Sequence, residues 1–413
     1  MTWLSQTVEK ASKSKPLTWI ARLIALIIFV ALGLKLIAYP FQVTWDGIAY
    51  LGSIAELQGK SVDQIHQFAY KQTRLGDTKQ YYESLIDDPQ YYATHPYTPD
   101  HIGSLNYRKV CAQNPVAFYQ QLPFYSSRRG YFLSIEAFHA LGASWAGAMR
   151  ANMVIPNLIF LAVAFATIAF SFDAVGILGL SLLFAFLQLY KGTPSHSTPD
   201  ALGLLFDSLA ILLGPLRKYL IPCLIFASIG TMIRPDSLLL VLALAGMAFY
   251  FYRDLSKKEK IFVAAIAIGM VLYVYVIQKL SHTYPMQTLY YHTFVHRLAY
   301  PALNKSGITV SHYFRQLFGQ VFQLGKSMRY IALLSILLFV FYVKCDQRYR
   351  WTSFAFWVGN AVAVFHFLIF PMYDDRYFDF LRVTVYVTLG CIYLQWMRDR
   401  AQNNAVAHLR PAN

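Results

Sequence analysis

Four short segments of the sequence combine carboxylates or arginines with the end of an apolar run. They are Thr44-Trp45-Asp46-Gly47, Lys191 to Asp200, Arg234-Pro235-Asp236 and Tyr373-Asp374-Asp375-Arg376-Tyr377. A carboxylate beside a membrane can have a raised pKa, which suits a general base. An arginine presents a planar fork of donors that binds phosphate. These residue types fit a reaction in which a base takes a hydroxyl proton while a phosphate is held.

The elements that must position these segments are apolar runs. They cover 19–39, 151–171, 174–190, 201–214, 219–233, 237–252, 261–280, 329–344, 351–371 and 377–397. Most of them approach the roughly 20 residues that a helix needs to cross a bilayer. Because 56% of residues are hydrophobic and only 14% are charged, against about a quarter charged in soluble proteins, the chain is not a typical soluble protein. We predict one all-α domain over 1–413, a polytopic transmembrane helical bundle of about ten spans.

The positions of Lys and Arg predict which side of the bilayer each loop faces. They cluster in the stretches 215–218, 253–260 and 345–350 and after 397. Such loops face the cytoplasm. With the N-terminus also cytoplasmic, all four candidate segments fall on the opposite side. The extracytoplasmic loops are then 40–150, with short helices on the membrane surface, and 281–328, which is itself basic and fits less well.

Two other classes of site are disfavoured by the sequence. The net charge of +15 would suggest a nucleic-acid partner in a soluble protein, but most basic residues lie in short loops between apolar runs. That distribution indicates topology, so we expect no nucleic-acid partner. The four cysteines form no CxxC pair, which argues against a disulfide framework and a zinc site.

Each candidate residue also has a structural interpretation. Asp46 can cap a helix that begins near Ile48, because aspartate is a good N-cap. Arg234 and Asp236 can simply pair with each other. Asp207, inside the run 201–214, fits a hydrogen-bonded interior carboxylate better than a catalytic group. What favours function is the convergence of all four segments on one side, since charges close to hydrocarbon are costly without a purpose.

This layout resembles the GT-C superfamily of polytopic glycosyltransferases, which use sugars linked to lipid phosphate. The resemblance rests on Trp45-Asp46-Gly47, the segment 123–133 with Arg128, Ile233-Arg234-Pro235-Asp236, and Asp375-Arg376-Tyr377-Phe378. The family often has two acidic residues in its first outer loop, whereas Gly47 follows Asp46 here. A divalent cation, Mg²⁺ or Mn²⁺, would need a second carboxylate from Asp200, Asp236 or Asp374, so the metal requirement stays open.

The resemblance implies an inverting transferase at the extracytoplasmic face of a bacterial-type inner membrane, with its site facing the periplasm, or in the lumen of a secretory compartment. Its partners would be a polyprenyl-phosphate sugar donor, membrane lipid, and a glycan, lipid or protein acceptor. The implied roles are Asp46 as general base, Arg234, Arg376 and more weakly Arg128 on the lipid phosphate, and Asp200, Asp236, Asp374 and Asp375 on the acceptor or a cation.

A transporter or flippase of a lipid-linked or anionic substrate is the alternative. The short runs 201–214 and 219–233 and the carboxylate of Asp207 favour it, because transporters use broken helices and charges at mid-membrane depth. Against it, the two halves of the sequence show no similarity. A non-catalytic scaffold is a third possibility, but it would not require so many acid and arginine pairs on one face.

Overall fold

A computed structural model of the chain describes most of its residues. The described ranges are 14–77, 79–86, 107–189, 198–214, 217–252, 254–304, 307–322, 350–371 and 375–408. Within these ranges every regular element is a helix, which confirms the all-α prediction. The predicted run 329–344 lies outside them.

Every other predicted apolar run forms a helix, and we call this set the bundle. Its members are α2 (Lys15–Ala38), α10 (Trp145–Ser171), α11 (Ala174–Leu189), α12 (Asp200–Leu213), α13 (Leu220–Ile233), α14 (Leu238–Phe251), α15 (Lys257–Leu280), α19 (Arg350–Ile369) and α20 (Asp375–His408). Three of them, α2, α10 and α15, are long and apolar enough to cross a membrane. Shorter apolar stretches occur in α11, α13, α14 and α19, so the number of spans remains a prediction.

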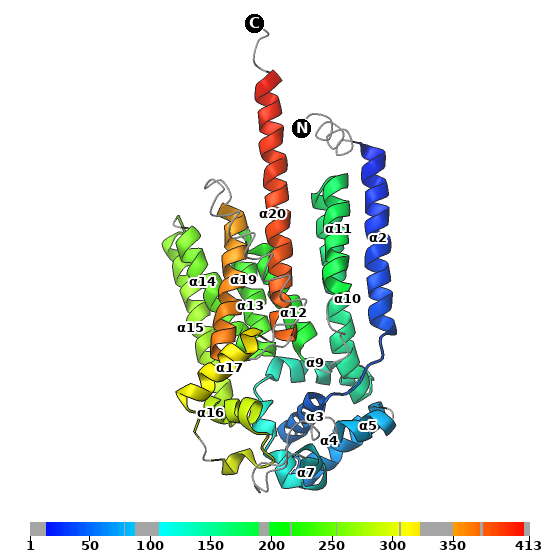
Figure 1. Cartoon of the computed structure of the whole chain (residues 1–413), viewed down its shortest axis with the longest axis vertical. Helices are drawn as coiled ribbons and strands as arrows, with labels where there is room; N and C mark the ends of the chain where they lie inside the picture. The colour runs from blue at the N-terminus through cyan, green and yellow to red at the C-terminus, as the bar shows by residue number, and fades with distance from the viewer. Residues whose placement is uncertain are drawn as a thin grey trace.

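The bundle helices run in roughly one direction (Figure 1). Small residues of α2, Ala21 and Ala25, are buried where this helix packs against α10 and α11. The opposite face of α2 exposes large apolar side chains, including Trp19 at 69% and Leu34 at 62%. Small residues inside and large apolar residues outside are typical of a helix that packs in a membrane.

The chain between α2 and α10 forms a second group of helices at one end of the bundle, which we call the cap (Figure 1). The cap consists of α3 (Trp45–Leu57), α4 (Val62–Gly76), α5 (Lys79–Ile86), α7 (Tyr107–Gln113), α8 (Pro115–Tyr119) and α9 (Arg129–Ala140). α2 begins and α20 ends on the side away from the cap.

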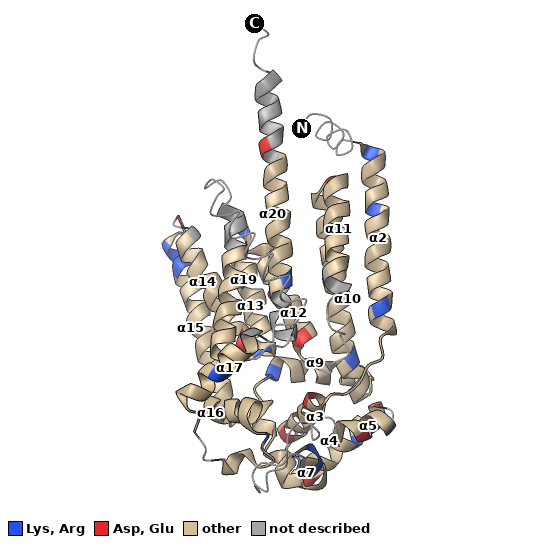
Figure 2. Cartoon of the chain, in the orientation of Figure 1, with Lys and Arg blue, Asp and Glu red and all other residues tan. Residues whose placement is uncertain are grey.

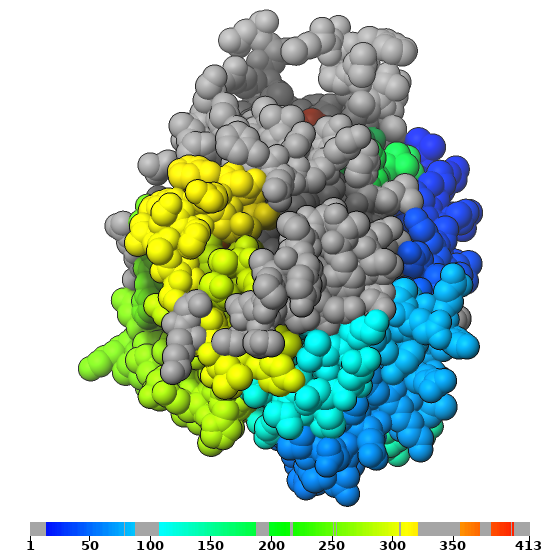
Figure 3. Space-filling view, turned by 60° about the horizontal axis from the view of Figure 1, so that its bottom comes forward, coloured from blue at the N-terminus to red at the C-terminus, as the bar shows by residue number. Residues whose placement is uncertain are grey.

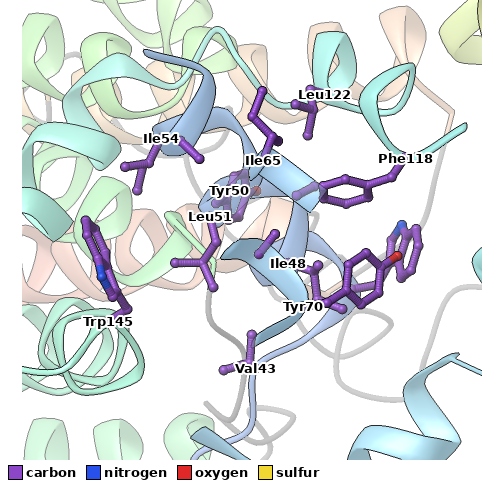
Figure 4. Close-up of a cluster of buried hydrophobic side chains, with 14 of the residues drawn as sticks. Val43, Ile48, Tyr50, Leu51, Ile54, Ile65, Tyr70, Phe118, Leu122 and Trp145 are labelled. Carbon is purple, nitrogen blue, oxygen red and sulfur yellow. The ribbon is translucent and has the colours of Figure 1, made fainter. Parts of the chain in front are cut away.

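The helix α3 is the centre of the cap. Every residue from Ile48 to Ala55 is buried, and the core around it includes Phe118, Leu122 and Trp145 (Figure 4). The sequence predicted short helices lying on a membrane surface. That placement stays a prediction for the loop as a whole. α3 itself is enclosed by protein, because its apolar residues surround the whole helix and can leave water only if other helices cover it.

The loop after α15 packs on the cap. It contains α16 (Met286–Tyr290), a π-helical turn Tyr291–Val295, and α17 (Val310–Phe322). The Gln121 side chain donates to the carbonyls of Leu298 and Ala299, at 3.0 and 3.1 Å. Seen from the cap end, the two loop regions share one face of the molecule (Figure 3). The cap is therefore held both by its own core and by the later loop.

Candidate functional site

The turn between α13 and α14 carries Arg234. α13 ends at Ile233 because Pro235 follows Arg234, and a proline disfavours helical backbone at the residue before it. Arg234 is accordingly extended, with φ −135° and ψ 105°. Its side chain lies along α12, where a Cβ on Gly203 would stand 2.7 Å from Arg234 Cδ. Glycine at position 203 therefore lets the arginine lie against this helix.

Arg234 joins carboxylates from two different elements. Its Nη1 lies 2.9 Å from Asp200 Oδ1 at the start of α12, and its Nε and Nη2 donate to the two oxygens of Asp236 in the 3-10 turn η3 (Pro235–Ser237). His366 Nε2 of α19 lies 3.5 Å from Asp236 Oδ2. Only 8% of Arg234 is exposed. We call Asp200, Arg234, Asp236 and His366 the ion cluster.

This arrangement favours a positioning role for Arg234. All three of its guanidinium nitrogens face carboxylate oxygens. The role on a lipid phosphate that the sequence suggests for Arg234 stays a prediction. The predicted pairing of Arg234 with Asp236 is present, and Asp200 joins it as a second carboxylate.

Asp46 lies in the first turn of α3 but is not its cap. The cap is Thr44, whose hydroxyl accepts the Gly47 N–H at 3.3 Å. Asp46 Oδ1 instead accepts a hydrogen bond from the Tyr125 hydroxyl at 3.2 Å. The interpretation of Asp46 as the N-cap is therefore wrong. A half-buried carboxylate remains, held by a tyrosine at the N-terminus of a helix, where the helix dipole stabilises negative charge.

Arg128 contacts Tyr125, the tyrosine that donates to Asp46. Its guanidinium carbon is 5.5 Å from the ring centre of Tyr50 and 5.8 Å from that of Tyr125, and Nη1 donates to the Phe124 carbonyl at 3.1 Å. Burial, and after it Asp46, raises the pKa of Tyr125 well above its usual value. Tyr125 thus stays protonated and can bridge a cation and a carboxylate.

The cap and the ion cluster meet at the start of α9. A Cβ on Gly130 would stand 2.9 Å from the backbone carbonyl atoms of Met232, next to the Arg234 turn. Tyr131 packs on Tyr50 with 5.2 Å between ring centres. Figure 2 shows acidic and basic residues gathered in this region of α3, α9 and α12. The structure thus brings Asp46, Arg128, Asp200, Arg234 and Asp236 to one boundary, between cap and bundle.

The remaining predicted site residues lie at the start of α20 and just before it. Asp374 lies outside the described residues. Asp375 and Arg376 begin α20, which packs against α12. Tyr125 and His366 were not singled out as site residues, and only the folded contacts reveal them. Trp45 is buried against Tyr107, with their ring centres 5.4 Å apart.

Replacing Gly130 by alanine should weaken the junction between cap and bundle. The added methyl group would meet the Met232 backbone at 2.9 Å, and a backbone cannot move aside as a flexible side chain can. Overpacking of this kind costs about 1–3 kcal/mol. Thermal unfolding of Gly130→Ala in lipid nanodiscs should show this loss, whereas Gly179→Ala, where a Cβ meets nothing within 4 Å, should not. Equal stability of the two variants would contradict the close contact.

The candidate ligands for a divalent cation are only partly described. The described part of the chain contains no group of three or more His, Cys, Asp and Glu that could hold a metal. Asp200 and Asp236 both face Arg234, whose positive charge opposes a second cation between them. Asp374, which the sequence also offers as a ligand, lies outside the described residues. The cation therefore stays a prediction, and no step is assigned to Mg²⁺ or Mn²⁺.

Comparisons of the chain with family models, with curated proteins and with solved structures find no match.

Proposed function

We propose that the protein is a membrane glycosyltransferase that moves a sugar from a polyprenyl-phosphate donor to a hydroxyl acceptor. The observation that carries the proposal is the meeting of Asp46, Arg128 and the ion cluster where the cap joins the bundle. These charged groups come from distant parts of the sequence and lie beside helices that are apolar enough for a membrane. A lipid-linked phosphate and a polar acceptor can both reach such a boundary.

In this mechanism Asp46 is the general base. Its carboxylate takes the proton from the acceptor hydroxyl as the hydroxyl oxygen attacks the anomeric carbon of the sugar. The bond between that carbon and the phosphate oxygen breaks, and the electron pair leaves with the lipid phosphate. Attack opposite the leaving group inverts the anomeric centre. Tyr125 holds the carboxylate in place through the 3.2 Å hydrogen bond.

The departing phosphate needs positive charge nearby. Among the residues that the structure describes, Arg128 is the candidate for this charge, because its guanidinium lies over Tyr50 and over Tyr125, which holds Asp46. Arg376 is the second candidate for binding the lipid phosphate, as the sequence suggests. Arg234 has a different role: it contacts both Asp200 and Asp236 and so fixes the two carboxylates at the edge of the site.

We further propose about ten spans in a bacterial inner membrane, with both termini in the cytoplasm and the cap in the periplasm. The start of α2 and the end of α20 on the side away from the cap support this arrangement (Figure 1). The basic residues at the start of α15, including Lys257, support it as well.

The topology can be tested by cysteine labelling in intact cells. Lys71 of α4 and Lys257 of α15 are both exposed. A membrane-impermeant maleimide should label Lys71→Cys and leave Lys257→Cys unlabelled until the cells are lysed. The unsubstituted protein gives the background from its own cysteines. Labelling of Lys257→Cys in intact cells would reverse the orientation and place the candidate site on the cytoplasmic side.

A transporter or flippase of a lipid-linked substrate is the second candidate. Asp207 favours it, since this carboxylate is buried inside α12. Among the described residues one of its oxygens accepts from the Ser237 hydroxyl at 2.8 Å and the other has no partner. Sealed proteoliposomes with polyprenyl-phosphate sugars in both leaflets separate the two functions. A transferase consumes donor and releases polyprenyl phosphate when an acceptor is added. A flippase moves the donor between leaflets and leaves it intact, and that result would overturn the transferase proposal.

A further inference from the structure

Tyr131 has a buried hydroxyl with no hydrogen-bond partner among the residues that the structure describes. The residue lies in the first turns of α9, and its side chain is completely buried. Burying a hydroxyl without a partner costs free energy, so nearly all such groups are paired in folded proteins. An exception beside a candidate site points to a partner that arrives from outside, such as a ligand.

The surroundings of Tyr131 are those of the candidate site. Its ring packs edge-on against Tyr50, which in turn lies under the Arg128 guanidinium. Burial, and then the neighbouring Tyr50, Asp200 and Asp46, raise the pKa of its phenol well above the usual value. The phenol is therefore protonated. Packing connects it to Asp46: Tyr50, on which Tyr131 packs, also packs on Tyr125 with 5.5 Å between ring centres. Tyr125 in turn donates to Asp46 at 3.2 Å.

The chemistry of these neighbours restricts the ligand. A group placed between a phenol O–H and carboxylates has to accept one hydrogen bond and donate another. An alcohol hydroxyl does both. A phosphate diester has no proton to donate to a carboxylate. Its charge is drawn to Arg128, which lies over Tyr50 on the other side of this aromatic group.

We propose that Tyr131 is an acceptor-binding residue whose hydroxyl donates a hydrogen bond to the acceptor hydroxyl while that hydroxyl donates to Asp46. This inference rests on the proposed function and names which substrate this part of the site receives. It also explains why an unpaired hydroxyl is present at a place where phenylalanine would pack without cost.

A matched control exists in the same core. Tyr70 is also buried with an unpaired hydroxyl among the described residues, but the charged group acting on its phenol is Arg108, and neither Asp46 nor Asp200 is among its neighbours. Tyr→Phe removes the same oxygen at both positions. A purely structural account predicts the same result for the two variants: unchanged or higher stability and unchanged binding.

The experiment measures thermal unfolding of wild type, Tyr131→Phe and Tyr70→Phe in lipid nanodiscs with two probes. Octyl β-glucoside below its micelle-forming concentration supplies acceptor-like hydroxyls, and decaprenyl monophosphate supplies the lipid phosphate. Without probes, neither variant should unfold below wild type. Tyr131→Phe should need about five- to tenfold more octyl glucoside for the same shift, the value of one neutral hydrogen bond. Its response to decaprenyl phosphate, and both responses of Tyr70→Phe, should match wild type.

Three results would overturn the proposal. In the first, Tyr131→Phe responds to octyl glucoside as wild type does. In the second, its thermal shifts with octyl glucoside and with decaprenyl phosphate weaken equally. In the third, octyl glucoside does not stabilise wild type. A failure of the proposed function is distinguishable, because it would show as intact lipid-linked donor in the transfer assay while the probe shifts still decide the role of Tyr131.

Discussion

Asp46→Asn should lower sugar transfer by about 100- to 10,000-fold, because a neutral amide cannot act as a general base. The fold should tolerate the change. Thr44, and not Asp46, accepts the N–H at the start of α3. Asparagine also keeps a side-chain oxygen that can accept from the Tyr125 hydroxyl, which now lies 3.2 Å from the carboxylate. Thermal unfolding and transfer should therefore separate in this variant.

Thr44→Ala is the matched control for Asp46→Asn. It removes the cap two residues away, which costs about 1 kcal/mol of stability, and it leaves the carboxylate in place. The expected pair of results is a stable, inactive Asp46→Asn and a less stable, active Thr44→Ala. If Asp46→Asn transfers sugar at a near-normal rate, Asp46 is not the base, and the base is Asp200, Asp236 or Asp374.

Arg234→Met should cause the largest loss of stability of any single substitution in the candidate site. It would leave Asp200 and Asp236 facing each other without the cation that both now contact. Removing one partner from a fully buried ion pair costs about 3–5 kcal/mol. The loss here should be smaller, because the side chains of Asp200 and Asp236 are 18% and 36% exposed. Arg234→Lys should lose part of this stability, since one ammonium group cannot reproduce the fork that binds Asp236 through two nitrogens.

The triple variant Asp200→Asn, Arg234→Met, Asp236→Asn tests the reason for that loss. The variant replaces Arg234 and both carboxylates that it contacts, and it leaves His366 in place. Replacing paired buried charges together by neutral residues is often close to neutral for stability. The triple variant should therefore unfold at a higher temperature than Arg234→Met, and it should remain inactive. A triple variant less stable than Arg234→Met would show that the carboxylates stabilise the fold without the arginine. Wild-type stability of Arg234→Met alone would show that the ion cluster does not stabilise the fold.

Much of the fold could be predicted because the signals are local. Long apolar runs identify the helices of the bundle, and α13 stops where Pro235 forces the chain out of the helix. The structure agrees with these predictions within a few residues at most helix ends. The enclosure of α3 was missed, because a 13-residue apolar helix can lie on lipid or inside a protein core, and only its neighbours decide between the two.

The candidate site was predictable as a set of segments and not as a set of contacts. Convergence on one side follows from topology alone, and the structure places Asp46 and Arg234 at the same boundary. The partners of each group depend on tertiary packing. His366 is 130 positions from Asp236 and approaches it only because α19 packs on α14. At α3, Thr44 and Asp46 are comparable capping residues, and the sequence offers no reason to prefer one of them.

The central claim is that the charged residues where the cap meets the bundle break the bond between a sugar and a lipid phosphate. The most direct measurement is mass spectrometry of the lipid after purified protein in nanodiscs has been incubated with a panel of polyprenyl-phosphate sugars and a hydroxyl acceptor. We predict release of free polyprenyl phosphate from at least one donor by wild type, and release at least 100-fold slower by Asp46→Asn. Intact donor throughout the panel, or equal release by both proteins, would contradict the account.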